Sequence, residues 1–217
     1  MTLAPQPGDG LVVVDMQYDF LPGGSLAVAG GDEIVGLVNA LAKRFANVVM
    51  TQDWHPPDHV SFASQHPGKS AFETIELSYG PQVLWPDHCV WQTRGAELSE
   101  KLDLPHAQLV IRKGFGRAVD SYSGFREADR KTKTGLEGYL RERRLGRLFV
   151  VGLATDFCVG WTALDARGAG FETYVIEDAT RAIDANGSLA RAWADMHAAG
   201  VKRIVSADVL GVIAHRR

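Results

Sequence analysis

The chain has 217 residues, of which 46% are hydrophobic and 23% charged, and its formal net charge is −3. This composition is typical of an ordinary globular protein and excludes a disordered chain or a strongly basic polyanion-binding protein. No stretch reaches the roughly 18 apolar residues of a membrane span, and the start lacks a signal-peptide pattern. We therefore expect a cytoplasmic protein with no nucleic-acid or membrane partner, folded as a single domain over residues 1–217.

The first half of the chain predicts two strands, one helix and a long irregular segment. A strand is expected at residues 11–15, ending in Asp15. A helix follows Gly30-Gly31, with Asp32 as its N-cap and apolar residues at helical spacing. A second strand at 47–52 leads into residues 53–93, which are rich in Pro, His and aromatic side chains. Long irregular segments inside a compact domain are usually functional.

The second half predicts four strands and three helices. A strand at 108–112 precedes Lys113 and an irregular segment at 113–131, and a helix is expected at 133–144. A strand at 147–152 runs into a turn and a helix at 158–169; strands at 172–177 and 202–205 then flank a helix at 188–199. Nearly continuous apolar strands between helices indicate burial on both faces. The predicted fold class is therefore α/β, a three-layer α/β/α arrangement around a mostly parallel sheet of about six strands.

Three reactive side chains follow the ends of three predicted strands: Asp15, Lys113 and Cys158. Ligands of open α/β folds bind at this carboxyl edge. A helix start beside Cys158 would also favour its thiolate and lower its pKa below the free value of about 8.5. Each residue has a structural alternative, such as a buried core position for Cys158 or a turn cap for Asp15. Together they supply the nucleophile, base and cation that activated-nucleophile catalysis requires.

A candidate metal site begins with Asp53 and His55, which lie two residues apart at the tip of the second strand. An extended backbone points both side chains to the same side. His88, in a loop after Pro86, is a candidate third ligand. One carboxylate and two imidazoles suit a single divalent ion such as zinc, iron or manganese. The D-x-H pattern also occurs by chance, and other loop residues with ligating side chains are equally well explained as solvated: Asp58, His59, His66 and Asp87.

Aromatic side chains lie in the loops after the first three strands, at Phe20, Trp85 and Tyr122. Near an active edge they predict a pocket for a flat ring, although single aromatic residues often pack on the core instead.

With these residues in view, the chain resembles the isochorismatase-like cysteine hydrolases, and among them most closely the nicotinamidases, which also hydrolyse pyrazinamide. Seven ordered blocks carry the resemblance: DMQYDF at 15–20, PGGSLAV at 22–28, TQDWHP at 51–56, WPDHCV at 85–90, RKG at 112–114, DSYSGF at 120–125 and GLATDFCV at 152–159. They cover nearly the whole chain, and their shared order is far more specific than any one block.

The resemblance implies a catalytic triad of Asp15, Lys113 and Cys158 and metal ligands at Asp53, His55 and His88. It also implies an oxyanion hole formed by the backbone N–H groups of Ala154 and Cys158, with a cis peptide before Ala154. Phe20, Trp85 and Tyr122 match the family's ring pocket. Some members recruit a fourth metal ligand, for which His59 and Ser61 are the candidates here.

The implied activity is hydrolysis of nicotinamide to nicotinic acid and ammonia through a thioester on Cys158, in NAD salvage. The divalent ion, with zinc expected first, would bind the ring nitrogen of the substrate. The alternative is another amidase of this superfamily acting on carbamoyl or ureido compounds, which would need the same triad without the metal group. The partners expected are small-molecule substrates and, as a further option, copies of the same chain.

Overall fold

The centre of the molecule is a six-stranded sheet with the strand order β5-β2-β1-β6-β7-β8. The computed structural model describes residues 3–211, and every neighbouring pair in this sheet is parallel. The strands are β1 Asp9–Val14, β2 Asn47–Asp53, β5 Leu109–Lys113, β6 Arg147–Leu153, β7 Glu172–Arg181 and β8 Lys202–Ile204. All six predicted strands and the predicted parallel α/β fold class are confirmed.

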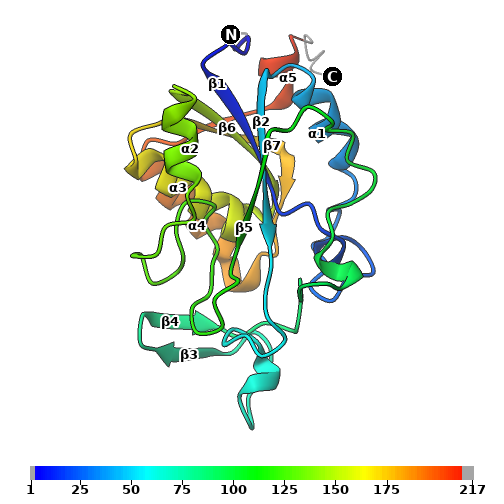
Figure 1. Ribbon diagram of the computed structural model, residues 1–217, viewed down its shortest axis with the longest axis vertical. Coiled ribbons are helices and arrows are strands. Elements are labelled where there is room, and N and C mark those ends of the chain that lie inside the picture. Colours follow the sequence, from blue (N-terminus) through cyan, green and yellow to red (C-terminus); the bar gives the residue numbers. More distant parts are fainter. Residues whose placement is uncertain (1–2, 212–217) are drawn as a thin grey trace.

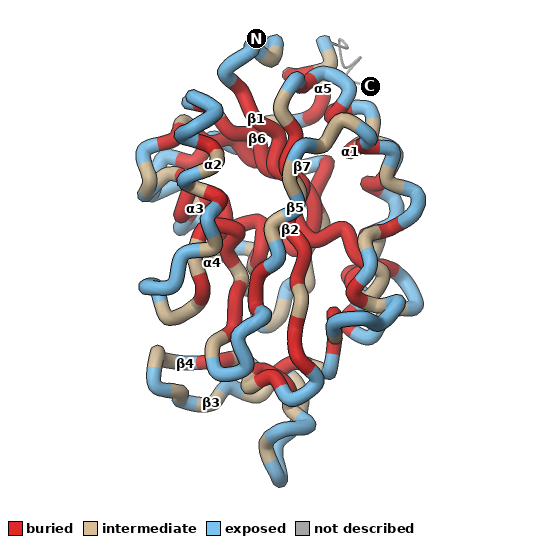
Figure 2. The backbone as a smooth tube through the Cα atoms, viewed as in Figure 1, coloured by how far each residue is buried: buried red, intermediate tan, exposed pale blue. Residues whose placement is uncertain are grey.

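Helices cover both faces of the sheet (Figure 1). α1 Val35–Ala42 and α5 Ser206–Leu210 lie on one face, and α2 Leu136–Glu142, α3 Gly160–Gly168 and α4 Ser188–Ala198 on the other. The side chains of β1 alternate between the two cores, since Leu11 and Val13 pack towards α1 while Val12 and Val14 pack towards α2 and α3. Burial on both faces is why these strands read as continuous apolar runs. Figure 2 shows the sheet as the buried centre of the molecule.

The structure differs from the sequence prediction at the start of α1. The helix begins at Val35 with Ile34 as the N-cap, so the predicted cap at Asp32 is wrong. Asp32 belongs to the preceding turn, where its carbonyl accepts a 3.3 Å hydrogen bond from the Val35 N–H. The helices predicted at 133–144 and 188–199 are confirmed as α2 and α4. Helix α2 is shorter than predicted at both ends, and α4 ends one residue earlier than predicted.

The sequence does not predict strands β3 and β4 or helix α5. The segment 53–93 contains an antiparallel hairpin of β3 Thr74–Leu77 and β4 Gly80–Val83, which lies beyond the carboxyl edge of the main sheet (Figure 1). The short helix α5 follows β8 directly.

The segment after β6 is a single wide helical turn, Thr155–Val159, which leads into α3. The carbonyl oxygen of Ala154 accepts hydrogen bonds from Phe157 N–H at 3.1 Å and from Val159 N–H at 3.0 Å. The second bond spans five residues and gives the turn its π-helical width. Cys158 therefore lies inside this turn and not at the first residue of the predicted helix 158–169.

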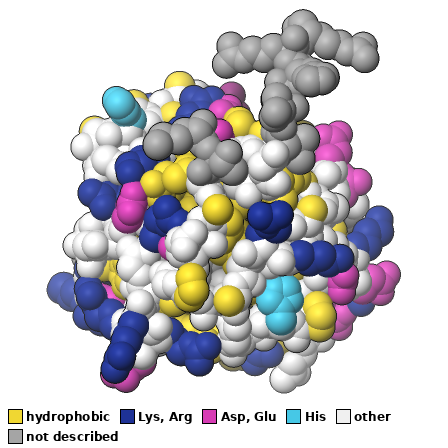
Figure 3. Space-filling view, turned by 90° about the horizontal axis from the view of Figure 1, so that it is seen from above, with side chains coloured by type: hydrophobic (Ala, Val, Ile, Leu, Met, Phe, Trp, Pro, Cys, Tyr) yellow, Lys and Arg dark blue, Asp and Glu magenta, His cyan; other side chains and the backbone are white. Residues whose placement is uncertain are grey.

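Within residues 3–211, no helix is both long and apolar enough to cross a membrane. On the end of the molecule that carries the amino ends of the strands, cationic, anionic and apolar side chains are interspersed (Figure 3).

Candidate active site

Four adjacent strands bring polar side chains to the carboxyl edge of the sheet. Asp15 follows β1, Asp53 ends β2, Lys113 ends β5, and Cys158 lies in the turn after β6. Because the strand order is β5-β2-β1-β6, these four residues converge on one point although up to 143 residues separate them in sequence. The predicted convergence of Asp15, Lys113 and Cys158 is present in the structure.

Lys113 lies at the centre of this cluster and is fully buried. Its Nζ lies 2.9 Å from Asp15 Oδ2, 2.8 Å from Asp53 Oδ1 and 3.5 Å from Cys158 Sγ, and it donates to the Ser121 carbonyl at 3.0 Å. Burial alone would lower the pKa of Lys113, but the two carboxylates outweigh it and hold the pKa well above its usual value. The ammonium group therefore stays charged and neutralises part of the buried negative charge.

The pKa values of Cys158 and Asp15 are both raised above their usual values. Burial raises the pKa of the Cys158 thiol well above its usual value, and the nearby carboxylates add to this effect against the opposing charge of Lys113. Burial also raises the pKa of Asp15. The expectation that a helix start lowers the pKa of Cys158 is therefore wrong, because the loss of solvation on burial raises this pKa.

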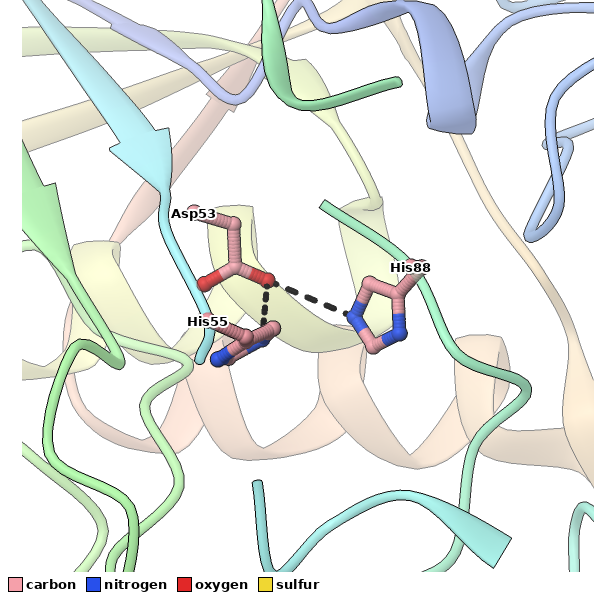
Figure 4. Close-up of side chains that lie close together, drawn as sticks. All are labelled: Asp53, His55 and His88. Carbon is pink, nitrogen blue, oxygen red and sulfur yellow. Dashed lines mark hydrogen bonds and ion pairs between the residues drawn. The ribbon is translucent and has the colours of Figure 1, made fainter. Parts of the chain in front are cut away.

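The candidate metal ligands Asp53, His55 and His88 are all buried and offer ligand atoms within 4.8 Å of one another. The Nε2 atoms of His55 and His88 lie 3.0 and 3.4 Å from the same carboxylate oxygen, Asp53 Oδ2 (Figure 4). Each Nδ1 is 2.8 Å from a backbone carbonyl, that of Gly114 for His55 and that of Pro86 for His88. An Nδ1–H that donates to a carbonyl leaves the Nε2 lone pair free for a metal.

This donor set fits a divalent ion. Two imidazole nitrogens and one carboxylate oxygen lie within 4.8 Å of one another on buried residues, and this combination of ligand types suits an ion such as zinc. The side chain of Gln17 fixes the backbone of Asp53. Its amide oxygen accepts a hydrogen bond from the Asp53 N–H at 2.8 Å, and its amide nitrogen donates to the Asp53 carbonyl at 2.7 Å.

His59 and Ser61, the open candidates for a fourth ligand, bond to each other. His59 Nδ1 lies 2.7 Å from Ser61 Oγ, and its Nε2 lies 3.1 Å from the Val119 carbonyl. Burial lowers the pKa of His59 to about 4. The ring stacks on His55, with centroids 4.1 Å apart, and both of its nitrogens already have partners in this arrangement. The ligand atoms of His55, His59 and Asp120 also lie within 4.8 Å of one another.

A pocket opens beside the cluster, and the three predicted aromatic residues line it. Its walls consist of Phe20, Leu26, Asp53, Trp85, His88, Asp120, Tyr122, Ala154, Phe157, Cys158 and Ile183. Phe157 packs edge-on against Trp85 with ring centroids 4.9 Å apart. The pocket thus joins the nucleophile, the metal group and an aromatic wall, the combination expected for a flat ring bearing a polar group.

Sequence reasoning missed four of these residues: Leu26, Asp120, Phe157 and Ile183. Phe157 had a usable signal, because it precedes Cys158 in the turn and is the kind of side chain that builds a ring pocket. Leu26 and Ile183 carry no such signal, since an isolated aliphatic residue in a loop does not indicate a ring pocket.

The peptide bond between Leu153 and Ala154 is cis, as the family resemblance implies. Ala154 and Cys158 both line the pocket.

The parallel α/β fold carries a thiol, a carboxylate and a lysine at one edge of its sheet, and a family model described as the isochorismatase domain matches residues 9–208. The chain belongs to the isochorismatase family. A protein of Acinetobacter baylyi named nicotinamidase is 60% identical over 92% of this chain and 94% of its own length. The family and the resemblance to nicotinamidases expected from the sequence are confirmed by these matches.

Solved structures agree with this assignment. The structure titled Acinetobacter baumanii nicotinamidase pyrazinamidease is 59% identical, covers 94% of this chain and 98% of that chain, and has a TM-score of 0.93. The pyrazinamidase of Pyrococcus horikoshii, solved in complex with zinc, is 36% identical over 92% of this chain and 99% of that chain, with a TM-score of 0.75. The prediction that the chain is an enzyme of this kind is confirmed.

Proposed function

We propose that this chain is a metal-dependent cysteine amidohydrolase that converts nicotinamide and water to nicotinic acid and ammonia, and pyrazinamide to pyrazinoic acid. The observation that carries the proposal is that Lys113 contacts both Asp53 of the metal group and the Cys158 thiol beside one aromatic pocket. A pyridine carboxamide carries a ring nitrogen and a carboxamide carbon that match these two centres. We assign the reaction to NAD salvage in the cytoplasm.

In the first chemical step, the proton of the Cys158 thiol moves to the Asp15 carboxylate, and Lys113 stabilises the thiolate that remains. The thiolate attacks the carboxamide carbon, and the electron pair of the C=O π bond moves onto oxygen. This transfer creates no new charge, because the negative charge on Asp15 moves to the sulfur, which lies 3.5 Å from the Lys113 ammonium. Asp15 is thus a base matched to a thiol that is neutral in the free enzyme.

In the second step, the electron pair on oxygen returns, the C–N bond breaks, and Asp15 gives its proton to the leaving nitrogen, which departs as ammonia. A thioester on Cys158 remains. Asp15 then takes a proton from a water molecule as the oxygen of that water attacks the thioester. Asp15 returns this proton to the Cys158 sulfur as the C–S bond breaks. The cycle releases nicotinic acid and restores the starting protonation of Asp15 and Cys158.

The backbone N–H groups of Ala154 and Cys158 are proposed to bind the oxyanion. Losing one such donor typically costs about 3–4 kcal/mol of transition-state stabilisation. Asp53, His55 and His88 would hold the divalent ion, zinc by preference, with iron or manganese as alternatives. When bound, the ion supplies a Lewis acid for the ring nitrogen of the substrate.

The competing function is hydrolysis of a carbamoyl or ureido compound by the same triad. The donor set of Asp53, His55 and His88 argues against it, because such substrates lack a ring nitrogen to meet an ion at this place. The aromatic walls formed by Trp85, Tyr122 and Phe157 likewise favour a flat ring.

The test is ammonia release from nicotinamide by the purified, metal-loaded enzyme, with Cys158→Ala as the matched blank. We expect one ammonia and one nicotinic acid per nicotinamide with the native chain and none with the variant. No release after zinc, iron or manganese has been restored would refute the proposed function. Faster turnover of a carbamoyl compound in the same assay would favour the alternative.

A further inference from the structure

The two carboxylate oxygens of Asp15 have different surroundings. Oδ1 accepts a 2.5 Å hydrogen bond from the hydroxyl of Thr51. Oδ2 lies 2.9 Å from the Nζ of Lys113, yet among the described residues no donor forms a directed hydrogen bond to it. One oxygen is therefore occupied by a hydroxyl, and the other faces the ammonium group and has a lone pair to spare.

Thr51 is fixed in this role from three sides. It lies on β2 beside β1 and is fully buried. Its Oγ1 accepts a 3.2 Å hydrogen bond from the Asp15 N–H, so the single hydroxyl proton is directed to Oδ1. Its methyl carbon fills the space beside Gly124, where a β-carbon would come within 2.9 Å of it. A β-branched side chain packed in this way keeps one rotamer.

The hydroxyl of Thr51 can keep its bond throughout the reaction. It donates to Oδ1 when Asp15 is a carboxylate and equally when Oδ2 carries a proton, since Oδ1 is then the carbonyl oxygen of the acid. Proton transfer at Oδ2 consequently needs no reorientation of the Thr51 hydroxyl. Without the hydroxyl, the buried Oδ1 would lose its partner and would compete with Oδ2 for the proton.

We propose that Thr51 is a positioning residue that occupies Oδ1 of Asp15 and leaves Oδ2 as the oxygen that accepts the Cys158 proton. This inference rests on the proposed function. The S–H bond of Cys158 breaks as an O–H bond forms at Oδ2, and the same proton later moves to the nitrogen that leaves as ammonia. Thr51 does not line the pocket, and its hydroxyl donates to Asp15, so we infer that it acts through Asp15.

The experiment compares Thr51→Val, which keeps the shape and removes the hydroxyl, with Thr51→Ser, which keeps the hydroxyl. We expect Thr51→Val to lower kcat for nicotinamide by about 10- to 100-fold with KM unchanged, because the loss concerns proton transfer and not ring binding. Thr51→Ser should stay within about threefold of the native kcat. Thr51→Ala gives the same test of hydroxyl loss if the valine variant does not fold.

Thr173→Val is the matched control. Thr173 is a fully buried strand residue on β7 whose hydroxyl donates to the Phe171 carbonyl at 3.1 Å, remote from Asp15. Its variant should lose stability but keep the native kcat. Metal content is measured for every variant, since Thr51 lies two residues from Asp53.

Three results would overturn the inference while the native chain is active: an unchanged kcat in Thr51→Val, an equal loss in Thr51→Ser, or a loss that follows a lowered metal content. Failure of the native chain itself to release ammonia from nicotinamide would instead count against the proposed function. The two failures are therefore distinguishable in one set of assays.

Discussion

Replacing Lys113 by Met should destabilise the protein more than any surface charge change, because it leaves two buried carboxylates without their cation. The group formed by Asp15, Asp53 and Lys113 carries a net charge of −1 when both acids are ionised. In Lys113→Met the charge becomes −2 at the same buried place. Asp15→Asn brings it to 0, and the double variant restores −1.

The magnitude follows from the distances. At 2.8 and 2.9 Å and an effective dielectric constant of about 20, each contact supplies roughly 6 kcal/mol of Coulomb energy before desolvation is subtracted. Removing one partner of a buried ion pair typically costs about 3–5 kcal/mol. We expect that loss in the free energy of unfolding of Lys113→Met, a large share of the roughly 5–15 kcal/mol of a whole domain. The double variant should recover about 1–3 kcal/mol relative to the sum of the single changes.

The assay is urea unfolding at neutral pH with a chelator present, followed by the fluorescence of the five tryptophans. Lys43→Met is the matched control, because Lys43 pairs with Asp103 at 3.2 Å with both side chains exposed, and its loss should change stability by less than about 1 kcal/mol. Strict additivity of Asp15→Asn and Lys113→Met, or native stability in Lys113→Met, would refute the electrostatic reasoning.

Three further predictions concern the site. Alkylation of Cys158 by iodoacetamide should still accelerate as the pH rises through about 8.5, the pKa of a free thiol, because burial raises the pKa of Cys158 well above its usual value. The variant Cys158→Ala corrects for Cys89, and a rate that stops rising below the pKa of a free thiol would contradict the prediction. A chelator should stop nicotinamide turnover, and added zinc should restore it. The variant His88→Ala should bind zinc weakly in a direct titration. An unchanged rate after chelation would show that the reaction does not need the ion. The variant Gln82→Leu should raise KM for nicotinamide roughly tenfold. The reason is that the Gln82 amide donates hydrogen bonds to Asp120 at 2.6 Å and to the Tyr122 hydroxyl at 3.0 Å in the pocket wall. Gln65→Leu is the control, because Gln65 is exposed. A native KM in Gln82→Leu would show that the pocket wall does not depend on this amide.

The strands of the sheet were predictable because their burial on both faces leaves a continuous apolar run in the sequence. The hairpin of β3 and β4 was not, since its strands are half-exposed and β4 contains Pro81, which normally argues against a strand. Helix α5 is only five residues long and gives no periodic signal.

The site divides in the same way. The pair Asp53 and His55 was predictable from side-chain alternation, and Lys113 from its place at the end of an apolar run. Thr51 and Gln82 were not, because their roles depend on hydrogen bonds to residues 36 and 38 positions away. The direction of the Cys158 pKa shift was predicted wrongly, since depth of burial is a property of the folded chain and not of the local turn.

The strand order also has a consequence for how activity is gained during folding. Asp15, Lys113 and Cys158 belong to distant stretches of the chain, and β2 and β1 lie between β5 and β6 in the sheet. Loop-closure entropy makes such non-local pairings slow to form. No fragment that lacks one of these four strands can hold the complete cluster. Recovery of the proposed ammonia release after dilution from urea should therefore report when the last of β5, β2, β1 and β6 has paired, and secondary structure should return before it.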